Sequence, residues 1–229
     1  MGEDSMHNTL YITDKRATEA FGYIVGAVLG DGTVWRRNRG DIDVYLYNQN
    51  IGLITEFCKC AHTLRLKYRI KEVIRTLKHP ERETLRLVKY YMVIMYSSPI
   101  GEIIAKYKQA PYKWRIPKEF INNKSFRRGF LRGLIDTEGC ISIIYRRNRK
   151  PLIKFVIVIS SCYNALAELK NYLELKDNIR LHLNYNNSKK NTYALYTYDR
   201  QEILKITSLI KYLAHTRKSK KFTKVLEVL

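Results

Sequence analysis

The sequence has few cysteines and histidines, which limits the metal and redox chemistry that it could support. Its four cysteines form no CxxC pair, and its five histidines show no HxxxH or similar ligand spacing. A zinc ribbon or a redox-active cysteine pair is therefore disfavoured. We interpret the cysteines as small buried side chains of an intracellular protein in a reducing compartment. The cytoplasm of a prokaryote and an organelle fit that description equally.

Long hydrophobic runs are also missing. The longest apolar run near the start covers residues 21–29 and is interrupted by two glycines. It is far too short to span a bilayer, and no secretory signal with a charged start, an apolar middle and a cleavage site is recognisable. Residues 1–13 form a polar leader that we exclude from the fold. No membrane partner is expected.

Acidic residues are scarce relative to basic ones. The chain has 42 Lys and Arg against 21 Asp and Glu, a net charge of +21. A chain this basic repels itself, so the charge indicates a polyanionic partner. Nucleic acid is favoured, because Lys and Arg neutralise phosphates and release counterions. An anionic membrane surface would require one basic amphipathic helix, whereas here the basic residues are spread along the whole chain.

An internal repeat is the most informative feature that the sequence does contain. Residues 21–32 and 128–139 align at an offset of 107 positions (133 − 26). The matched glycines are Gly22 with Gly129 and Gly26 with Gly133. Each copy ends on an acid followed by glycine, with Asp31 in the first copy and Glu138 in the second. The chain is therefore expected to contain two related halves.

The spacing of these glycines predicts two closely packed helices. Four residues make about one helical turn, so the small residues line one face of each helix. Glycine inside a helix costs roughly 0.5–1 kcal/mol relative to alanine, and close backbone packing is the natural reason to keep it. If the helices lie parallel, Asp31 and Glu138 emerge together at one end. A helix cap would explain a lone Asp-Gly, but it does not explain acids at matched positions. A phosphate loop is disfavoured, since no GxGxxG or following Lys-Ser/Thr is present.

The segments after each copy repeat the same order of elements. In the first half we predict strands over 33–37, 41–49, 68–76 and 84–96, with helices over 51–64 and 99–108. In the second half we predict strands over 141–145, 153–160, 179–186 and 191–198, with helices over 163–175, 201–213 and 218–228. The expected fold is α+β, with two pseudo-symmetric αββαββα halves at 14–110 and 126–229 and a connection at 111–125. Because both copies lie in one chain, a monomer is expected.

Two motif copies with matching flanks resemble the LAGLIDADG homing endonucleases of the monomeric, two-motif type. Residues 131–139 read LRGLIDTEG, and residues 24–32 read IVGAVLGDG. The resemblance covers nearly all of the chain after about residue 14. It implies a pseudo-twofold molecule with a two-helix central interface and saddle-shaped antiparallel sheets that bind the DNA major groove. It also implies metal-dependent cleavage of both strands of a long target, which promotes intron or intein mobility.

The same resemblance implies the catalytic residues. Asp31 and Glu138 would bind the divalent cation, assisted by the backbone carbonyls of Gly30 and Thr137. Carboxylates suit Mg²⁺, which neutralises charge on the phosphate and helps to generate hydroxide. Mn²⁺ is expected to substitute, and Ca²⁺ to support binding without cleavage. Asp136 is interpreted as a polar residue at the helix end rather than as a catalytic acid, since Leu29 is its counterpart.

Polar residues next to the acids are a further expectation from the family. The candidates are Asn48, Gln49, Ser160 and Lys154, with Lys71 and Lys89 as weaker possibilities. Strand alternation and the basic turns predict the surface that contacts double-stranded DNA. The first half contributes Trp35, Arg36, Arg37, Arg39, Asp43, Tyr45, Tyr47, Gln49, Arg69, Lys71, Arg75 and Arg86. The second half contributes Ser142, Arg146, Arg147, Arg149, Lys154, Arg180, His182, Asn184, Asn186, Lys189 and Lys190.

Two other functions are compatible with the same scaffold. One is an RNA-binding maturase that acts on its own intron RNA, and the other is a DNA-binding protein without catalysis. A protein of either kind could lose the acids without losing its function. Because both acids are present at matched positions, the sequence favours a nuclease.

Overall fold

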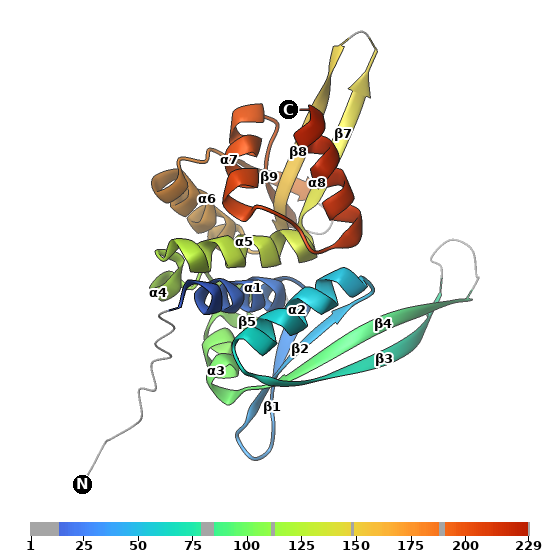
Figure 1. The fold of residues 1–229 in the computed structure, drawn as a ribbon, viewed down its shortest axis with the longest axis vertical. Helices are drawn as coiled ribbons and strands as arrows, with labels where there is room; N and C mark the ends of the chain where they lie inside the picture. Colours follow the sequence, from blue (N-terminus) through green and yellow to red (C-terminus); the bar gives the residue numbers. More distant parts are fainter. Residues whose placement is uncertain (1–13, 79–84, 111–112, 148, 188–190, 229) are drawn as a thin grey trace.

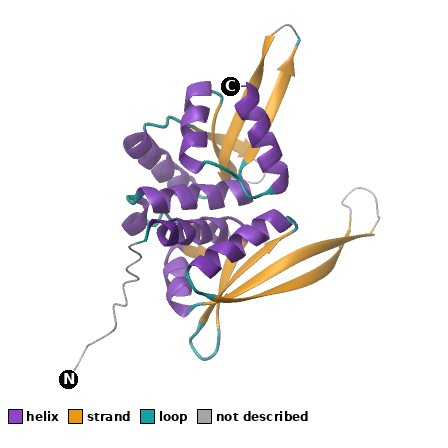
Figure 2. Ribbon diagram, viewed as in Figure 1, coloured by secondary structure: helices purple, strands orange, loops and turns teal. Residues whose placement is uncertain are grey.

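The computed structural model describes residues 14–78, 85–110, 113–147, 149–187 and 191–228, so the leader at 1–13 lies outside the described residues. Helices α1 (Lys15–Asp31) and α5 (Lys124–Glu138) lie side by side at the centre, with one sheet and its helices on either side (Figures 1 and 2). Within the described ranges, no helix is long and apolar enough to cross a membrane.

Each half places a four-stranded antiparallel sheet after its central helix. In the first half the elements after α1 are β1 (Gly32–Arg36), β2 (Ile42–Asn48), α2 (Ile51–Thr63), β3 (Lys67–Lys78), β4 (Leu85–Tyr96) and α3 (Ser98–Tyr107). In the second half the elements after α5 are β7 (Cys140–Arg146), β8 (Arg149–Ser160), α6 (Tyr163–Asp177), β9 (His182–Asn187), β10 (Thr192–Thr197), α7 (Arg200–Ile210) and α8 (Thr216–Val228). The strand orders β1-β2-β4-β3 and β7-β8-β10-β9 are equivalent. The predicted α+β class is confirmed, and so is the prediction of one equivalent antiparallel sheet in each half.

The segment between the halves contains more structure than was predicted. It forms β5 (Lys108–Ala110), β6 (Lys113–Trp114) and the short helix α4 (Lys118–Ile121). The two short strands pair with each other. Residues on both of them reach the centre of the molecule, as described below.

Glycine makes the central helix pair possible. A methyl group added at Gly22 or Gly26 would collide with the carbonyl oxygen of Phe126 or Phe130, respectively. Methyl groups at the matched glycines of α5 would collide with backbone of α1 in the same way. The glycine stripes therefore face each other, as their spacing predicted. Because the helices are parallel, both end at the same side of the molecule (Figure 1).

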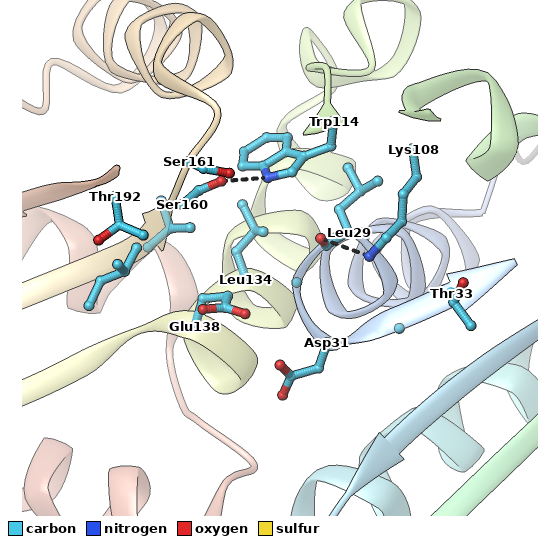
Figure 3. Close-up of a pocket in the computed structure, with 14 residues that line it drawn as sticks. Leu29, Asp31, Thr33, Lys108, Trp114, Leu134, Glu138, Ser160, Ser161 and Thr192 are labelled. Carbon is cyan, nitrogen blue, oxygen red and sulfur yellow. Dashed lines mark hydrogen bonds between the residues drawn. The ribbon is translucent and has the colours of Figure 1, made fainter. Parts of the chain in front are cut away.

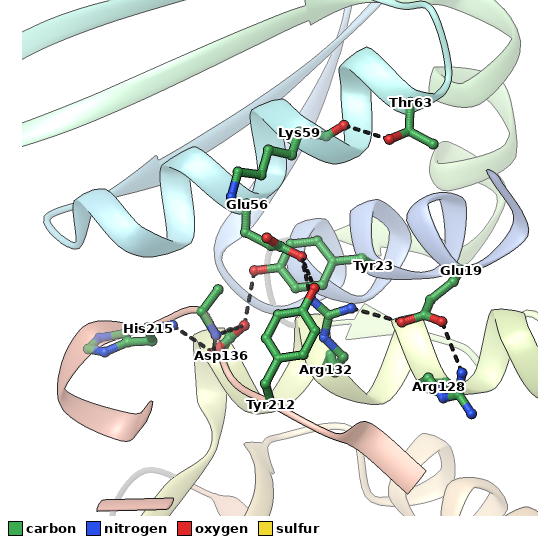
Figure 4. Close-up of polar contacts among 11 residues, drawn as sticks. Glu19, Tyr23, Glu56, Lys59, Thr63, Arg128, Arg132, Asp136, Tyr212 and His215 are labelled. Atoms are coloured by element: carbon green, nitrogen blue, oxygen red, sulfur yellow. Dashed lines mark hydrogen bonds and ion pairs between the residues drawn. The ribbon is translucent and has the colours of Figure 1, made fainter. Parts of the chain in front are cut away.

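Two different sets of side chains flank this interface. Aromatic rings pack on one side, where Phe126 lies 5.4 Å from Phe21 and 5.9 Å from Phe130 between ring centroids. On the other side the buried guanidinium of Arg132 is paired with Glu19 at 2.9 Å and with Glu56 (Figure 4). The repeat is therefore symmetric in its backbone but not in its side chains.

Candidate active site

The two matched acids lie at the ends of the central helices and line one cavity. Asp31 is the last residue of α1, and Glu138 is the last residue of α5. Gly32 and Gly139 follow them in extended conformation; Gly32 is the first residue of β1, and Gly139 directly precedes β7. The cavity has a volume of about 820 Å³, and its lining also includes Lys108, Trp114 and Ser160 (Figure 3). The repeat therefore brings both predicted catalytic acids to one site.

The environments of the two carboxylates differ. The Glu138 side chain is half-buried. Its burial, which is the larger effect, and repulsion from Asp31 together raise the pKa of its carboxyl to about 7. Asp31 is exposed, and its carboxylate accepts a hydrogen bond of 3.0 Å from the Asn48 amide. The two carboxylates repel each other, so a cation bound at this site would stabilise their charged forms.

Two lysines bind the ends of the same helices. The Lys108 ammonium donates to the carbonyls of Val28 and Leu29 at 2.6 and 3.2 Å. The Lys218 ammonium donates to the carbonyls of residues 135, 136 and 137 at 2.9, 2.8 and 2.9 Å. Cations at a helix C-terminus satisfy carbonyls that lack intrahelical partners. Both helix ends therefore carry an ammonium group beside an acid.

Burial lowers the pKa of Lys108 to about 8, although Asp31 and Glu138 oppose this shift. Burial also lowers the pKa of Lys218, and the negative charges of Asp136, Asp31 and Glu138 oppose this shift. This pair was not among the predicted site residues, because Lys108 is the last residue of one predicted helix and Lys218 the first residue of another. A detectable signal was present, because each lysine follows its acid at a similar distance, 77 residues (108 − 31) and 80 residues (218 − 138).

The predicted polar neighbours of the acids are only partly brought together. Asn48 contacts Asp31 directly, and Gln49 is exposed. The Ser160 hydroxyl lines the cavity and accepts a 3.0 Å hydrogen bond from the Trp114 indole. The assignment of Lys154 to the site is wrong. Its ammonium lies 4.7 Å from the ring centre of Tyr196, on the sheet, and the side chain is not part of the cavity lining.

Hard oxygen donors make the site chemically suited to a divalent cation. Mg²⁺ typically binds one or two carboxylates and completes its coordination with water and phosphate oxygens. Asp31 and Glu138 provide two such carboxylates. Among the described residues, no third His, Cys, Asp or Glu joins them. Gly30 lines the cavity, while the carbonyl of Thr137 accepts from Lys218, which competes with a metal for that oxygen.

The register of the first sheet places most predicted DNA contacts on one face. Tyr45 lies opposite Ile94, which lies opposite Arg69, and Tyr47 is connected through Met92 to Lys71 in the same way. Side chains of opposed residues share a face. Val44 and Leu46 alternate with the tyrosines and are buried beneath the sheet. The residues on the outer face are Trp35, Tyr45, Tyr47, Arg69, Lys71 and Arg75.

Two residues predicted to contact DNA in the first half are not exposed on this outer face. Arg36 lies opposite Ile42 on the helix side of the sheet and pairs with Glu102 at 2.9 Å. Arg36 follows Trp35 in β1, and successive side chains of a strand point to opposite faces, so Arg36 points away from the outer face. Asp43 is on the outer face but is buried, because Arg37 covers it through a 2.6 Å ion pair. The Arg86 side chain lies outside the described residues.

The second sheet presents a comparable face. Ser142 lies opposite Lys154, His182 opposite Tyr196, and Asn184 opposite Ala194. The pairing of β10 with β8 shifts by one residue between Leu195 and Tyr196. Because of this bulge, Ser160 and Lys154 point to opposite faces of the sheet. Arg39, Arg147, Arg180 and Asn186 are exposed. Arg146, Arg149, Lys189 and Lys190 have side chains outside the described residues.

Comparison with known proteins relates the second half of the chain to one family. The model of the LAGLIDADG endonucleases matches residues 131–229, which contain the second motif and its sheet. The second half of the chain therefore matches the LAGLIDADG endonuclease family. A curated relative, the ribonucleoside-diphosphate reductase NrdEB subunit alpha of Bacillus subtilis, is 26% identical over 159 residues. That match covers 66% of this chain and 14% of the reductase, so the chain corresponds to only a small part of the reductase's length.

Solved structures share the fold over most of the chain. The homing endonuclease I-WcaI bound to its DNA recognition sequence matches with a TM-score of 0.63 at 13% identity. The match covers 97% of this chain and 94% of the I-WcaI chain. A variant of I-DmoI in complex with its target DNA and magnesium has a TM-score of 0.56 at 14% identity, with 86% and 98% covered. Full-length DUF199/WhiA from Thermatoga maritima has a TM-score of 0.57 at 15% identity, with 92% and 60% covered. The fold is therefore shared with homing endonucleases and with WhiA.

Proposed function

We propose that this protein is a site-specific endonuclease that hydrolyses both strands of double-stranded DNA in a divalent-metal-dependent reaction. The observation that carries the proposal is the pair of acids at matched helix ends, which line one cavity, with a lysine bound to the end of each helix. The fold alone would not support this function, because folds host unrelated activities. The I-WcaI and I-DmoI structures contain target DNA, which supports a DNA partner for this chain.

Asp31 and Glu138 would hold Mg²⁺, with Mn²⁺ as a substitute. When bound, the ion would neutralise charge on the scissile phosphate and lower the pKa of water. Asn48 donates to the Asp31 carboxylate and fixes its orientation. Lys108 and Lys218 hold positive charge beside the acids, where a phosphodiester gains negative charge during hydrolysis. The basic outer faces of the two sheets bind the flanking DNA and set its register.

Promotion of intron or intein mobility is the biological role that we infer. The curated relative supports this role, because its similarity to the chain is confined to a small part of a much longer protein. An endonuclease carried within an unrelated host protein would produce that pattern.

The test is to select a target and then separate binding from cleavage. The protein would be incubated with a library of long randomised duplexes in Ca²⁺, and the retained duplexes transferred to Mg²⁺. We expect double-strand cleavage of a defined site in Mg²⁺ and no cleavage by the Asp31→Asn, Glu138→Gln double variant. Site-specific binding without cleavage in Mg²⁺ or Mn²⁺ would instead indicate a non-catalytic DNA-binding protein. If intron RNA added as a competitor were retained in preference to the duplexes, the result would indicate a maturase.

A further inference from the structure

Asp136 is a buried carboxylate that the proposed chemistry does not use. Its side chain is fully buried two residues before Glu138. It accepts hydrogen bonds from the backbone N–H of Ala214 at 3.1 Å, the N–H of His215 at 3.0 Å and the hydroxyl of Tyr23 at 3.0 Å (Figure 4). Three donors from distant parts of the chain therefore converge on one side chain.

The two backbone donors belong to the turn that leads into the catalytic centre. α7 ends at Ile210, Lys211 adopts a positive φ of 67°, and α8 begins at Thr216. Lys218 follows in the first turn of α8. A second contact supports the same turn, since the N–H of Thr216 donates to the side chain of Asn50 at 3.2 Å. Any movement of the turn would displace the Lys218 ammonium.

We propose that Asp136 is a positioning residue that fixes the turn at 211–216 against the end of α5 and thereby holds the Lys218 ammonium beside Glu138. The inference rests on the proposed endonuclease function, in which Lys218 contributes at the reaction centre. Carboxylate acceptors make stronger hydrogen bonds than neutral ones, which suits a side chain that must hold backbone in place. Without the carboxylate, three donors at the end of α5 would lose their acceptor.

The first half provides an internal comparison. At the position equivalent to Asp136 it carries Leu29, which cannot accept a hydrogen bond through its side chain. Lys108 directly follows α3 and still reaches the carbonyls of Val28 and Leu29. Asp136 is therefore expected to act on one lysine of the pair and not on the other.

Lysine labelling tests the positioning without reference to activity. An acylating reagent and peptide mass spectrometry would give the modification rates of Lys218, Lys220 and Lys108 in wild type and in Asp136→Asn. We expect the Lys218 rate to rise several-fold in the variant, while the exposed Lys220 and the buried Lys108 keep theirs. Asp136→Leu, if it folds, should give a larger rise. An unchanged Lys218 rate in Asp136→Asn would show that the carboxylate does not hold the turn.

A double-mutant cycle tests the consequence for catalysis. Asp136→Asn should slow cleavage by roughly 10-fold or more, because small displacements of a reacting constellation cost up to about 100-fold. This loss should vanish in a Lys218→Met background and persist in a Lys108→Met background, with DNA binding in Ca²⁺ unchanged. If Asp136→Asn costs the same factor in both backgrounds, Asp136 does not act through Lys218. If wild type cuts no DNA, the proposed function fails, and the labelling experiment still decides the role of Asp136.

Discussion

At the scale of single residues, the inequivalence of the two acids has a measurable consequence. Asp31 is exposed and held by Asn48, whereas Glu138 is half-buried beside it. Asp31→Asn and Glu138→Gln each remove one hard anionic ligand, so both should severely reduce cleavage. The two single variants should also accumulate nicked product and differ in which strand is cut first. Strand-specific end labels on one target would measure this, with gel shifts in Ca²⁺ as the control for binding. Wild-type cleavage of both strands by Glu138→Gln would contradict the assigned site.

The raised pKa of Glu138 predicts how stability depends on pH. A carboxyl whose pKa is raised from 4.5 to about 7 by folding stabilises the protein when protonated. That contribution is complete below about pH 4.5 and is lost as the pH rises through 7. In EDTA, Glu138→Gln should therefore melt above wild type at pH 8, and the difference should shrink towards pH 5. Adding Mg²⁺ at pH 8 should raise the Tm of wild type more than that of the variant. A difference in Tm that does not change with pH would contradict this environment for Glu138.

At the scale of elements, the contact between α1 and α5 depends on the glycine stripes. A leucine at Gly26 would collide with the backbone of Phe130. Overpacking of this kind typically costs about 1–3 kcal/mol, and here the obstacle is backbone, which adjusts less easily. Gly26→Leu should lower the Tm by several degrees or prevent folding, as measured by calorimetry. Thr55→Leu on the exposed face of α2 is the matched control and should melt close to wild type. A wild-type Tm for Gly26→Leu would mean that the helices do not meet at this stripe.

Sequence periodicity predicted the elements well because their causes are local. The alternation of apolar and polar residues predicted the strands. The acid-Gly pairs predicted where α1 and α5 end. The bulge at Tyr196 could not be predicted from the alternation, and because of it Ser160 and Lys154 point to opposite faces of the sheet. Lys108 and Lys218 were overlooked for a related reason. Their role depends on α3 and α8 being placed against helix ends 77 and 80 residues earlier, which no local pattern encodes.

At the scale of the whole molecule, the two motif copies complete one interface within a single chain. Each glycine stripe already faces the other, so no second copy is needed to bury it. We expect the free protein to sediment as a monomer at micromolar concentration and to bind one target duplex per chain. Sedimentation velocity with and without the duplex measures both. A stable dimer of the free protein would contradict the filled interface.

The net charge of +21 predicts strongly salt-dependent DNA binding, and the sheet register identifies the residues that should carry it. Each phosphate that the protein neutralises contributes about −0.9 to the slope of log K against log salt concentration. Lys71 points from the outer face of β3, so Lys71→Gln should reduce the magnitude of the slope by about 1 if it contacts a phosphate. Arg36 points to the helix side and pairs with Glu102, so Arg36→Gln should leave the slope unchanged although it removes the same charge. Fluorescence anisotropy across a salt series measures both variants. Equal changes of slope would mean that the charge acts only through the overall field, and that the outer face of the sheets is not the DNA-binding surface.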